Sequence, residues 1–338
     1  MTATVPVLPL AELLDPALAE PGPDGLPAQP LVLVDLDRVD WTDPPPPPRA
    51  DLGFVAVGVA TETLPRSAGP VLRRLTCTLG DAPGRYGAGD PAEAAAVAAT
   101  VAAAPRAALT LVGLLGLTAR VAPRRGLLAE SLAYSMLLGG PEFATWRRSR
   151  PVRAVPPATD PVLVGRSGNT LSVTLNRPER HNAFGAAVRD GLLGALELAR
   201  LDPTIGRVVV GGAGRSYCSG GDLDEFGTAP DPAAAHLIRL RTSCARAVLD
   251  LDAPVEFRLH GACVGAGIEI PAFAPTVLAR DDAFFQLPEL GLGLIPGAGG
   301  TVGITRRIGR WRTAYLALTG TRLDLARALD WGLVDGRW

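Results

Sequence analysis

Strand-like and helix-like segments alternate along residues 160 to 338, and this alternation limits the folds open to the chain more than any other feature. The segments are a strand at 171–176, a helix near 185–201, a strand at 208–212, a helix near 232–250 and a strand at 255–261. Such alternation is typical of right-handed βαβ units, in which a crossover helix joins two parallel strands. The second half is therefore predicted to be an α/β domain with a mostly parallel sheet.

The first half shows the same kind of pattern less clearly. Residues 1–30 are rich in Pro, Ala and Gly and are interpreted as an arm, and Pro44 to Pro48 as a loop, because proline cannot donate to a helix or a sheet ladder. Residues 31–150 form a predicted α/β region, and a linker at 150–161 joins it to the second domain, residues 160–338. The elements predicted in this region are strands at 31–36, 54–60 and 107–112 and helices at 90–104 and 129–150, the last with a break at 139–141.

Two segments of the first half can be laid over segments of the second half. Residues 101–116 match 249–265, since both end a helix with Ala-Pro and enter a Gly-containing turn through a strand-like run, and residues 133–148 match 314–329. One interpretation is that the first half is a degenerate copy of the second-half domain. The alternative is that Ala-rich α/β segments look alike because of their composition.

The composition is that of a globular protein and excludes several functions. Apolar residues make up 47% and charged residues 20% of the sequence, which allows a sizeable core. A net charge of −1 and the lack of any run of basic residues argue against a nucleic-acid partner and against an anionic membrane surface. The sequence contains no Lys, which excludes Schiff-base chemistry and the Lys of a phosphate-binding P-loop.

The cysteines and the apolar stretches indicate a cytoplasmic protein that does not enter a membrane. Four widely spaced cysteines without a C-x-x-C pair predict reduced, buried thiols rather than a disulfide framework or a zinc site. No basic residues precede the apolar N-terminal residues, as they would in a secretory signal. The most apolar stretch, 107–117, is about 11 residues long, well short of the roughly 20 needed to cross a bilayer.

Four motifs occur in order in the second half. They are LNRPERHNAF (175–184), GGAGRSYCSGGDLDEF (211–226), HGACVGAGIEI (260–270) and FQLPELGLGLIPGAGGT (285–301). Taken together, they resemble the enoyl-CoA hydratase/isomerase (crotonase) superfamily over about half of the chain. The resemblance implies a crotonase-like ββα-superhelix module, an acyl-CoA thioester substrate, and no metal or cofactor beyond the coenzyme A that the substrate carries. It also implies a homo-oligomer, either a trimer or a hexamer, with a complex containing a partner subunit as the alternative.

Two Gly-rich turns among these motifs suit a reaction that passes through a thioester enolate. An enolate places negative charge on one oxygen, and two backbone N–H groups aimed at that oxygen stabilise it. Glycine lets the backbone approach closely enough. The resemblance assigns the two donors to the N–H groups of Gly221 and Ala266; the alternative is that the glycines only form tight turns. A dinucleotide-binding loop is not indicated, because Ile270 stands where the third glycine of that motif belongs.

Two glutamates decide the predicted reaction. In the hydratases that this module resembles, glutamates at the positions of Glu269 and Glu289 hold a water between them. The first activates the water for attack on the β-carbon, the second protonates the α-carbon, and Gly297 matches the position whose backbone N–H helps to hold the water. Such an addition needs one group that accepts a proton and another that donates one, and the proximity of two carboxyls raises the pKa of at least one of them. The alternative is that Glu269 caps a helix and Glu289 is a surface acid.

The coenzyme A contacts are assigned by resemblance to the turn after the strand at 171–176 and to the Gly-rich loop that follows the strand at 208–212. The assigned residues are Arg180, His181, Ala183, Ser219 and Asp222. A guanidinium in the turn would suit phosphate groups. His181 is interpreted as a surface or stacking residue rather than a base, and the other two histidines as structural.

The resemblance fails at both ends of the domain. The sequence stops at WGLVDGRW, where family members continue into helices that cover the acyl pocket, and about 150 residues that ordinary hydratases lack precede the domain. One related branch, the dihydroxyphenylacetyl-CoA dioxygenases, also has a large N-terminal extension. We expect residues 30–150 to pack on the second half, to cover apolar faces that would otherwise be exposed, and to supply no catalytic group.

The leading hypothesis is a lyase that hydrates an enoyl-CoA or dehydrates a 3-hydroxyacyl-CoA through Glu269 and Glu289. The same pair could isomerise a double bond or hydrolyse a thioester. The N-terminal extension leaves open a cofactor-free acyl-CoA dioxygenase. The early stop leaves open a non-catalytic partner subunit that binds coenzyme A.

Overall fold

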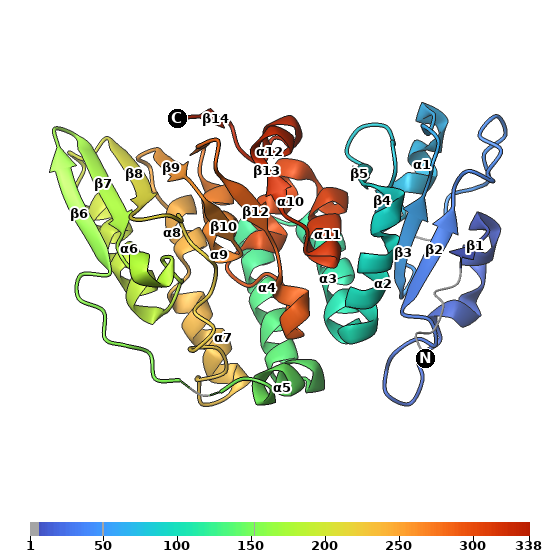
Figure 1. Ribbon diagram of the computed structural model, residues 1–338, viewed down its shortest axis with the longest axis horizontal. Coiled ribbons are helices and arrows are strands. Elements are labelled where there is room, and N and C mark those ends of the chain that lie inside the picture. The colour runs from blue at the N-terminus through green and yellow to red at the C-terminus, as the bar shows by residue number, and fades with distance from the viewer. Residues whose placement is uncertain (1–6, 49–50, 152) are drawn as a thin grey trace.

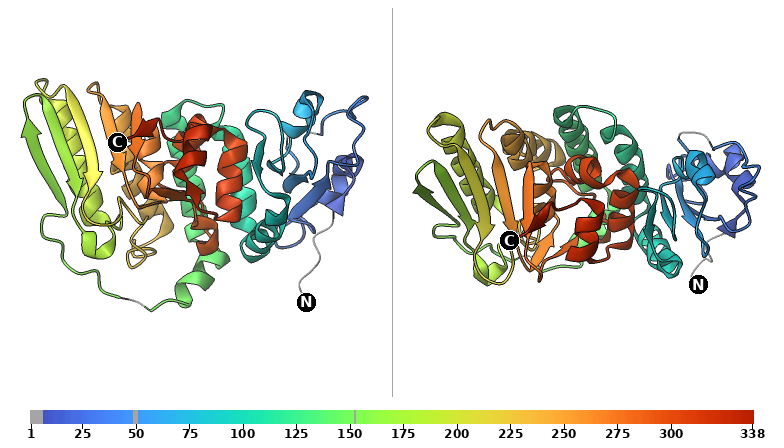
Figure 2. Two further views of the ribbon diagram at one scale, coloured as in Figure 1. Left: turned by 45° about the horizontal axis from the view of Figure 1, so that its top comes forward. Right: turned by 90° about the horizontal axis from the view of Figure 1, so that it is seen from above.

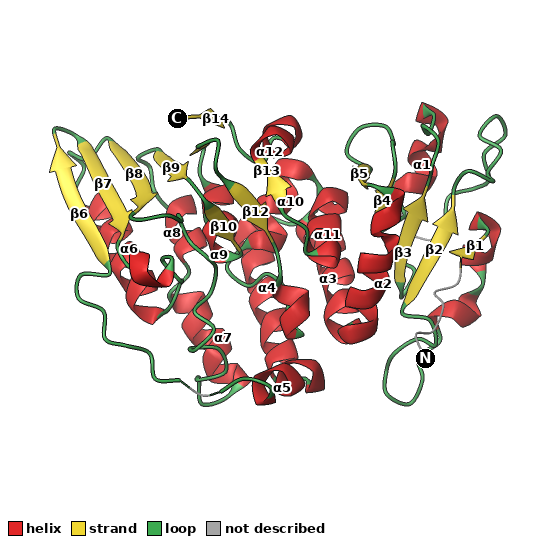
Figure 3. Ribbon diagram, in the orientation of Figure 1, coloured by secondary structure: helices red, strands yellow, loops and turns green. Residues whose placement is uncertain are grey.

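The computed structural model describes residues 7–48, 51–151 and 153–338. Within these residues the molecule is elongated, with a sheet towards each end and helices between them (Figure 1). The N-terminal sheet lies at one end and the hairpin that opens the second half lies at the other, as the two further views in Figure 2 also show. The helices between the sheets come from both halves of the chain (Figure 3).

The second half contains the mostly parallel sheet predicted from the sequence. Its six strands have the order β14-β11-β9-β8-β7-β6, and β6 and β7 form the antiparallel pair. They are β6 (Val162–Ser167), β7 (Thr170–Leu175), β8 (Arg207–Gly212), β9 (Val255–Leu259), β11 (Thr276–Ala279) and β14 (Gly336–Arg337). Leu171, Val173 and Leu175 of β7 are buried while Ser172 between them is exposed, which is the alternation that a strand with one covered face requires. A smaller sheet has the order β10-β12-β13, made of Ala262–Val264, Phe284–Gln286 and Leu323–Asp324.

The helices of the second half follow the predicted alternation, with one division that was not predicted. They are α6 (Ala186–Leu201), α7 (Pro232–Arg241), α8 (Cys244–Leu249), α9 (Ala266–Glu269), α10 (Gly300–Ile308), α11 (Arg310–Thr319) and α12 (Leu325–Trp331). The single helix predicted near 232–250 is two helices, α7 and α8. The break comes at Thr242, and the Ser243 side chain then caps α8 by accepting a hydrogen bond from Arg246 N–H.

The first half forms a second parallel sheet of five strands in the order β1-β2-β3-β4-β5. The strands are β1 (Val7–Leu8), β2 (Leu31–Asp35), β3 (Val55–Val59), β4 (Cys77–Leu79) and β5 (Gly87–Gly89). The strands predicted at 31–36 and 54–60 are confirmed, and Pro44 to Pro48 carry no regular structure. The interpretation of residues 1–30 as an arm is wrong for the described part, because β1 pairs with β2, and Leu10 and Leu13 are buried.

The helices of the first half correct one predicted strand. They are α1 (Gly69–Leu72), α2 (Ala94–Ala103), α3 (Pro105–Thr118), α4 (Pro123–Leu138) and α5 (Pro141–Arg148). The strand predicted at 107–112 lies inside α3, which buries Ala107, Ala108, Leu111 and Leu115 at helical spacing. A short apolar run does not distinguish a strand from a buried helix by periodicity alone. The match of residues 101–116 to 249–265 fails for the same reason, since the second segment contains strand β9.

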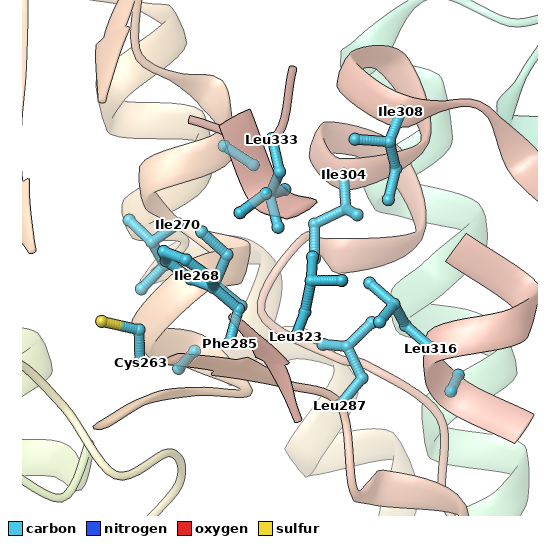
Figure 4. Close-up of a cluster of buried hydrophobic side chains, with 14 of the residues drawn as sticks. Cys263, Ile268, Ile270, Phe285, Leu287, Ile304, Ile308, Leu316, Leu323 and Leu333 are labelled. Atoms are coloured by element: carbon cyan, nitrogen blue, oxygen red, sulfur yellow. The ribbon is translucent and has the colours of Figure 1, made fainter. Parts of the chain in front are cut away.

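The two halves share one hydrophobic core. Helices α3 and α4 pack on α10, α11 packs on α2 and α3, and α4 also packs on α7. The part of this core around Ile268, Phe285 and Leu316 is shown in Figure 4. The Thr118 hydroxyl in α3 also donates a 2.7 Å hydrogen bond to the carbonyl of Thr301 in α10. The expectation that residues 30–150 pack on the second half is confirmed.

Two further expectations concern the cysteines and the apolar helices. All four cysteines are buried free thiols, as expected. Among the described residues, no single helix is long and apolar enough to cross a membrane; Pro91–Ala103 and Pro105–Thr118 reach that length and composition only when taken together across a bend of 108°.

Candidate active site

The two Gly-rich turns lie side by side because backbone hydrogen bonds join the segments that carry them. Cys218 N–H donates to Ala262 O over 3.1 Å, and Val264 N–H donates to Cys218 O over 3.0 Å. Gly265 has a positive φ of 50°, and a Cβ atom added to it would lie 2.5 Å from Glu289 Oε1. Glycine therefore meets both the backbone and the space requirements of this turn.

The turns place the backbones of Gly221 and Ala266 at the wall of one cavity of about 810 Å³. This is the size of a site for a small organic ligand. Neither N–H group donates a hydrogen bond to another described residue. Ala266 opens α9, so its N–H is among those that a helix leaves unpaired. Two unpaired donors at one wall can hold a single oxygen that carries negative charge.

Residues from both halves of the chain line the cavity. The first half contributes α4 and the start of α5, and the second half contributes α7, α8 and the loop between β8 and α7. Figure 1 shows α4 standing beside α7, and the two helices are packed against each other. The apolar side chains of the lining include Leu127, Leu138, Phe143, Phe184, Phe226 and Ile238.

Glu269 lines this cavity, and one of its two carboxyl oxygens is held by hydrogen bonds. Its side chain is only 2% exposed. Oε2 accepts hydrogen bonds from Ala298 N–H and Gly300 N–H, each over 2.8 Å. Burial raises the pKa of Glu269 to about 7, although these two amide bonds act in the opposite direction. A carboxyl with this pKa can take up or release a proton near neutral pH.

Glu289 faces the same point of the cavity as Glu269. A Cβ atom on Gly265 would lie 2.5 Å from Glu289 Oε1 and 3.7 Å from Glu269 Oε1, so the two Oε1 atoms converge. Glu289 Oε2 is buried and has no hydrogen-bond partner among the described residues. Burial, and after it the charge of Glu269, raises the pKa of Glu289 well above its usual range. Glu269, whose Oε2 accepts two amide hydrogen bonds, is thus the carboxyl of the pair with more stabilisation of its ionised form.

A third carboxyl, Glu130, reaches the site from α4 of the first half. Its side chain is 2% exposed, and it accepts hydrogen bonds from Gly299 N–H over 2.7 Å and from Thr301 N–H over 2.9 Å. The Thr301 hydroxyl adds a third bond of 2.6 Å. The backbone N–H groups of residues 298 to 301 thus donate alternately to Glu269 and Glu130. Burial, followed by the charge of Glu269, raises the pKa of Glu130 to about 8.

Glu130 and its neighbour Tyr134 are first-half residues at the site, and the expectation that the first half supplies no catalytic group stays a prediction. Both line the cavity. The Tyr134 ring lies directly against Gly297, where an added Cβ would be 2.3 Å from Tyr134 Cδ2. The sequence held a partial signal, because an acid and two serines interrupt the apolar helical run of residues 127–138. The local sequence does not reveal which element packs against such a helix face, because tertiary packing decides it.

The turn assigned to coenzyme A is held by side-chain hydrogen bonds, and its arginine is paired with two carboxylates. Arg180 Nη2 donates to Asp222 Oδ1 over 2.6 Å and to Asp224 Oδ2 over 2.9 Å. His181 has a left-handed backbone, with φ of 52°, and its Nδ1 lies 3.1 Å from Ser216 Oγ. With two carboxylates on its guanidinium, Arg180 is compensated within the protein rather than left free for a phosphate.

The predicted site residues divide into two groups. Those that line the cavity are Gly221, Asp222, Ala266, Glu269, Glu289 and Gly297. Those that lie in the adjoining turn and loop, outside the described lining, are Arg180, His181, Ala183 and Ser219. The lining residues that sequence reasoning missed include Glu130, Tyr134 and Arg239. The remaining histidines have local partners: His260 Nε2 lies 3.1 Å from Gly214 O, and His236 Nδ1 lies 2.9 Å from Ser131 Oγ.

Replacing Glu130 by Gln is expected to lower the free energy of unfolding by about 1–3 kcal/mol, the cost of a buried donor without a partner. Each Glu130 oxygen accepts one backbone N–H, so an amide nitrogen in either place leaves the N–H of Gly299 or of Thr301 unpaired. Chemical denaturation measures the change, and Glu12→Gln, at an exposed position, is the control. Equal stability of both variants would contradict the role of Glu130 in joining the two halves.

Comparisons with known proteins agree with this geometry over the second half. The sequence model described as enoyl-CoA hydratase/isomerase matches residues 165–336. The chain is 34% identical over 174 residues to 2,3-dehydroadipyl-CoA hydratase of Escherichia coli (strain K12), covering 52% of this chain and 68% of that protein. It is 36% identical over 169 residues to 1,2-epoxyphenylacetyl-CoA isomerase of the same strain, covering 48% and 64%. The crystal structure of enoyl-CoA hydratase from Thermoplasma volcanium GSS1 superposes with a TM-score of 0.50 at 31% identity, covering 53% of this chain and 72% of that one.

Proposed function

Because the chain belongs to the enoyl-CoA hydratase/isomerase family, we propose that it is an acyl-CoA lyase that adds water to a 2-enoyl-CoA or removes it from a 3-hydroxyacyl-CoA. The observation that carries this proposal is the convergence of Glu269 and Glu289 on one point of the cavity, beside two unpaired backbone N–H groups. The two carboxyls differ in the way that acid–base catalysis of an addition requires.

The proposed steps use the two carboxyls and the two N–H groups in separate roles. The thioester oxygen lies between the N–H groups of Gly221 and Ala266, which stabilise the enolate. Glu269 Oε1 takes a proton from water as the oxygen of that water bonds to the β-carbon. The electron pair of the double bond moves into the enolate. Glu289 then gives its proton to the α-carbon, which completes the hydrated thioester.

Two features of the site support this division of roles. Glu269 Oε2 is fixed by two amides, so Oε1 is the oxygen left to receive a proton. No described amide donates a hydrogen bond to Glu289 Oε2, and this lack favours the protonated form of the Glu289 carboxyl. We further propose that Gly297 N–H helps to hold the water, with Tyr134 packed behind it. Coenzyme A enters past the Asp222 side of the cavity, where the Arg180 pair shapes the turn.

The rate of hydration is expected to rise and then fall with pH. Glu269 must be ionised to accept a proton, so kcat/KM rises as the pH passes through its pKa of about 7. Glu289 must be protonated to donate, so kcat/KM falls as the pH passes through the raised pKa of this carboxyl. The rise and the fall of kcat/KM with pH belong to Glu269 and Glu289 as a pair, because the two carboxyls titrate together. A profile that stays flat between about pH 5 and pH 10 would contradict these roles.

Replacing Glu269 by Gln is expected to reduce the hydration rate by about 10²-fold, within the usual range for one acid–base group. The Gln carbonyl can occupy the place of Oε2 and accept the same two amides, so the shape of the site is kept while the base is lost. Glu197→Gln, on the exposed face of α6, is the control. An unchanged rate would move the chemistry to isomerisation through Glu289 alone.

A panel of 2-enoyl-CoA thioesters tests the proposed function directly. Hydration removes the conjugated thioester absorbance, and we expect this loss to depend on the protein. Isomerisation is the second candidate, because the same carboxyl pair can move a proton between two carbons of the acyl chain. Formation of conjugated absorbance from a 3-enoyl-CoA, without hydration, would favour it. Oxygen uptake would indicate the dioxygenase alternative, and binding without turnover would indicate a non-catalytic subunit.

A further inference from the structure

Arg239 of α7 places a guanidinium in the cavity wall next to α4. Its Nη1 donates to Ser131 O over 3.2 Å, to Ser131 Oγ over 3.0 Å and to Ser135 Oγ over 3.1 Å. The guanidinium carbon lies 4.2 Å from the centre of the Tyr134 ring. These contacts fix the side chain in one orientation, with its charge directed along the cavity-facing side of α4.

This charge has no counter-ion within the described chain. The other arginines of the cavity lining are paired: Arg124 with Asp250 at 2.6 Å, Arg189 with Asp190 at 2.8 Å, and Arg246 with Asp250 at 3.7 Å. Arg239 forms no ion pair with a described carboxylate, and its Nε and Nη2 make no hydrogen bond to a described residue. An arginine that only braced α7 against α4 would need no more than the Nη1 contacts.

Glu130 is next in sequence to Ser131, which Arg239 contacts, but the carboxyl of Glu130 already has other hydrogen-bond partners. Glu130 directs both of its oxygens at α10, where they accept the N–H groups of Gly299 and Thr301. Burial lowers the pKa of Arg239, and the proximity of Tyr134 and Glu130 acts in the opposite direction. A guanidinium does not lose its proton in a protein, so a partly desolvated positive charge remains in the wall.

Arg239 is linked to the carboxyl pair through Tyr134. Tyr134 contacts Gly297 with one edge of its ring and Arg239 with one face. Gly297 adjoins Ala298, whose N–H holds Glu269. We infer that an acyl chain that starts at the thioester and passes the carboxyls runs along Tyr134 towards Arg239. Its path is flanked by apolar side chains such as Leu138 and Ile238.

We propose that Arg239 binds a carboxylate at the far end of the acyl chain, so that the substrates are ω-carboxyacyl-CoA thioesters. Two nitrogens of a guanidinium can hold the two oxygens of a carboxylate, and Nε and Nη2 are the pair left free here. The apolar path would take up the methylenes, and the terminal charge would replace the counter-ion that the protein lacks. The inference rests on the proposed function for the place of the thioester.

Binding of saturated thioesters tests the inference apart from turnover. We compare adipoyl-CoA and suberoyl-CoA with hexanoyl-CoA and octanoyl-CoA by calorimetry, so that each pair differs only in the terminal carboxylate. A charge-assisted hydrogen-bonded pair should make the diacid thioester of at least one length bind about tenfold more tightly or better. Equal affinities within both pairs would overturn the inference.

Variants at two positions of α7 show whether Arg239 causes the preference. Arg239→Met should remove the preference for the carboxylate while hexanoyl-CoA still binds, which also shows that the variant is folded. Arg241→Met, at an exposed position outside the cavity lining, should keep the preference. Retention of the preference in Arg239→Met would overturn the inference. If no 2-enoyl-CoA is hydrated but the Arg239-dependent preference is present, the proposed function fails and the inference stands.

Discussion

Replacing Glu289 by Gln is expected to lower the hydration rate by about 10³–10⁴-fold, at the upper end of the usual range for one acid–base group. The amide keeps the shape of the side chain but cannot deliver a proton to the α-carbon. Glu289 Oε2 has no described hydrogen-bond partner, so the substitution breaks no bond of that oxygen. Affinity for a saturated acyl-CoA should therefore remain nearly unchanged.

Steady-state kinetics on a 2-enoyl-CoA and a Kd for a saturated acyl-CoA measure the two parts of this prediction. The expected pattern is a loss in kcat with little change in Kd, which indicates a group that acts in the transition state rather than in binding. Turnover at the wild-type rate would contradict the assignment of Glu289 as the acid. A parallel loss of binding would indicate a structural role instead.

Expressing residues 155–338 alone is expected to give an insoluble or aggregating product. Without the first half, the faces of α10 and α11 that pack on α2, α3 and α4 become exposed. The N–H groups of Gly299 and Thr301 lose the carboxylate of Glu130 as well. Large exposed apolar patches rarely remain uncovered in soluble proteins, and unpaired buried donors add to the cost.

The matched control is the full chain with a protease site placed in the linker at residues 150–161. Cleavage after folding should leave the two parts together and soluble, because the core that joins them does not depend on the linker. Size-exclusion chromatography and activity measurements distinguish the two preparations. A soluble, fully active fragment of residues 155–338 would refute the idea that the first half completes the domain.

Sequence reasoning succeeded where the local pattern carries the structure. The left-handed turn at Gly265 and the close approach of Glu289 both require glycine, so the Gly-rich motif indicated the geometry directly. The alternating burial of β7 was likewise readable as a strand. These features depend on residues close together in the sequence or on motifs that occur in a fixed order.

Sequence reasoning failed where packing between distant segments decides the structure. Residues 107–112 are apolar and strand-like, but their burial against the shared core makes them part of α3. Glu130 was not singled out in the sequence, and its position follows from contacts with residues 299 and 301 in the other half. Arg180 was assigned to coenzyme A by resemblance, and its pairing with Asp222 and Asp224, which the folding of the loop brings to it, could not be predicted from the sequence.

A structure with a saturated acyl-CoA bound tests the central claim most directly. We expect the thioester oxygen within hydrogen-bond distance of Gly221 N–H and Ala266 N–H, and the α- and β-carbons beside Glu289 and Glu269. This arrangement would place the acid and the base at the two carbons between which water is added. A thioester bound elsewhere, with both N–H groups left unoccupied, would contradict the claim.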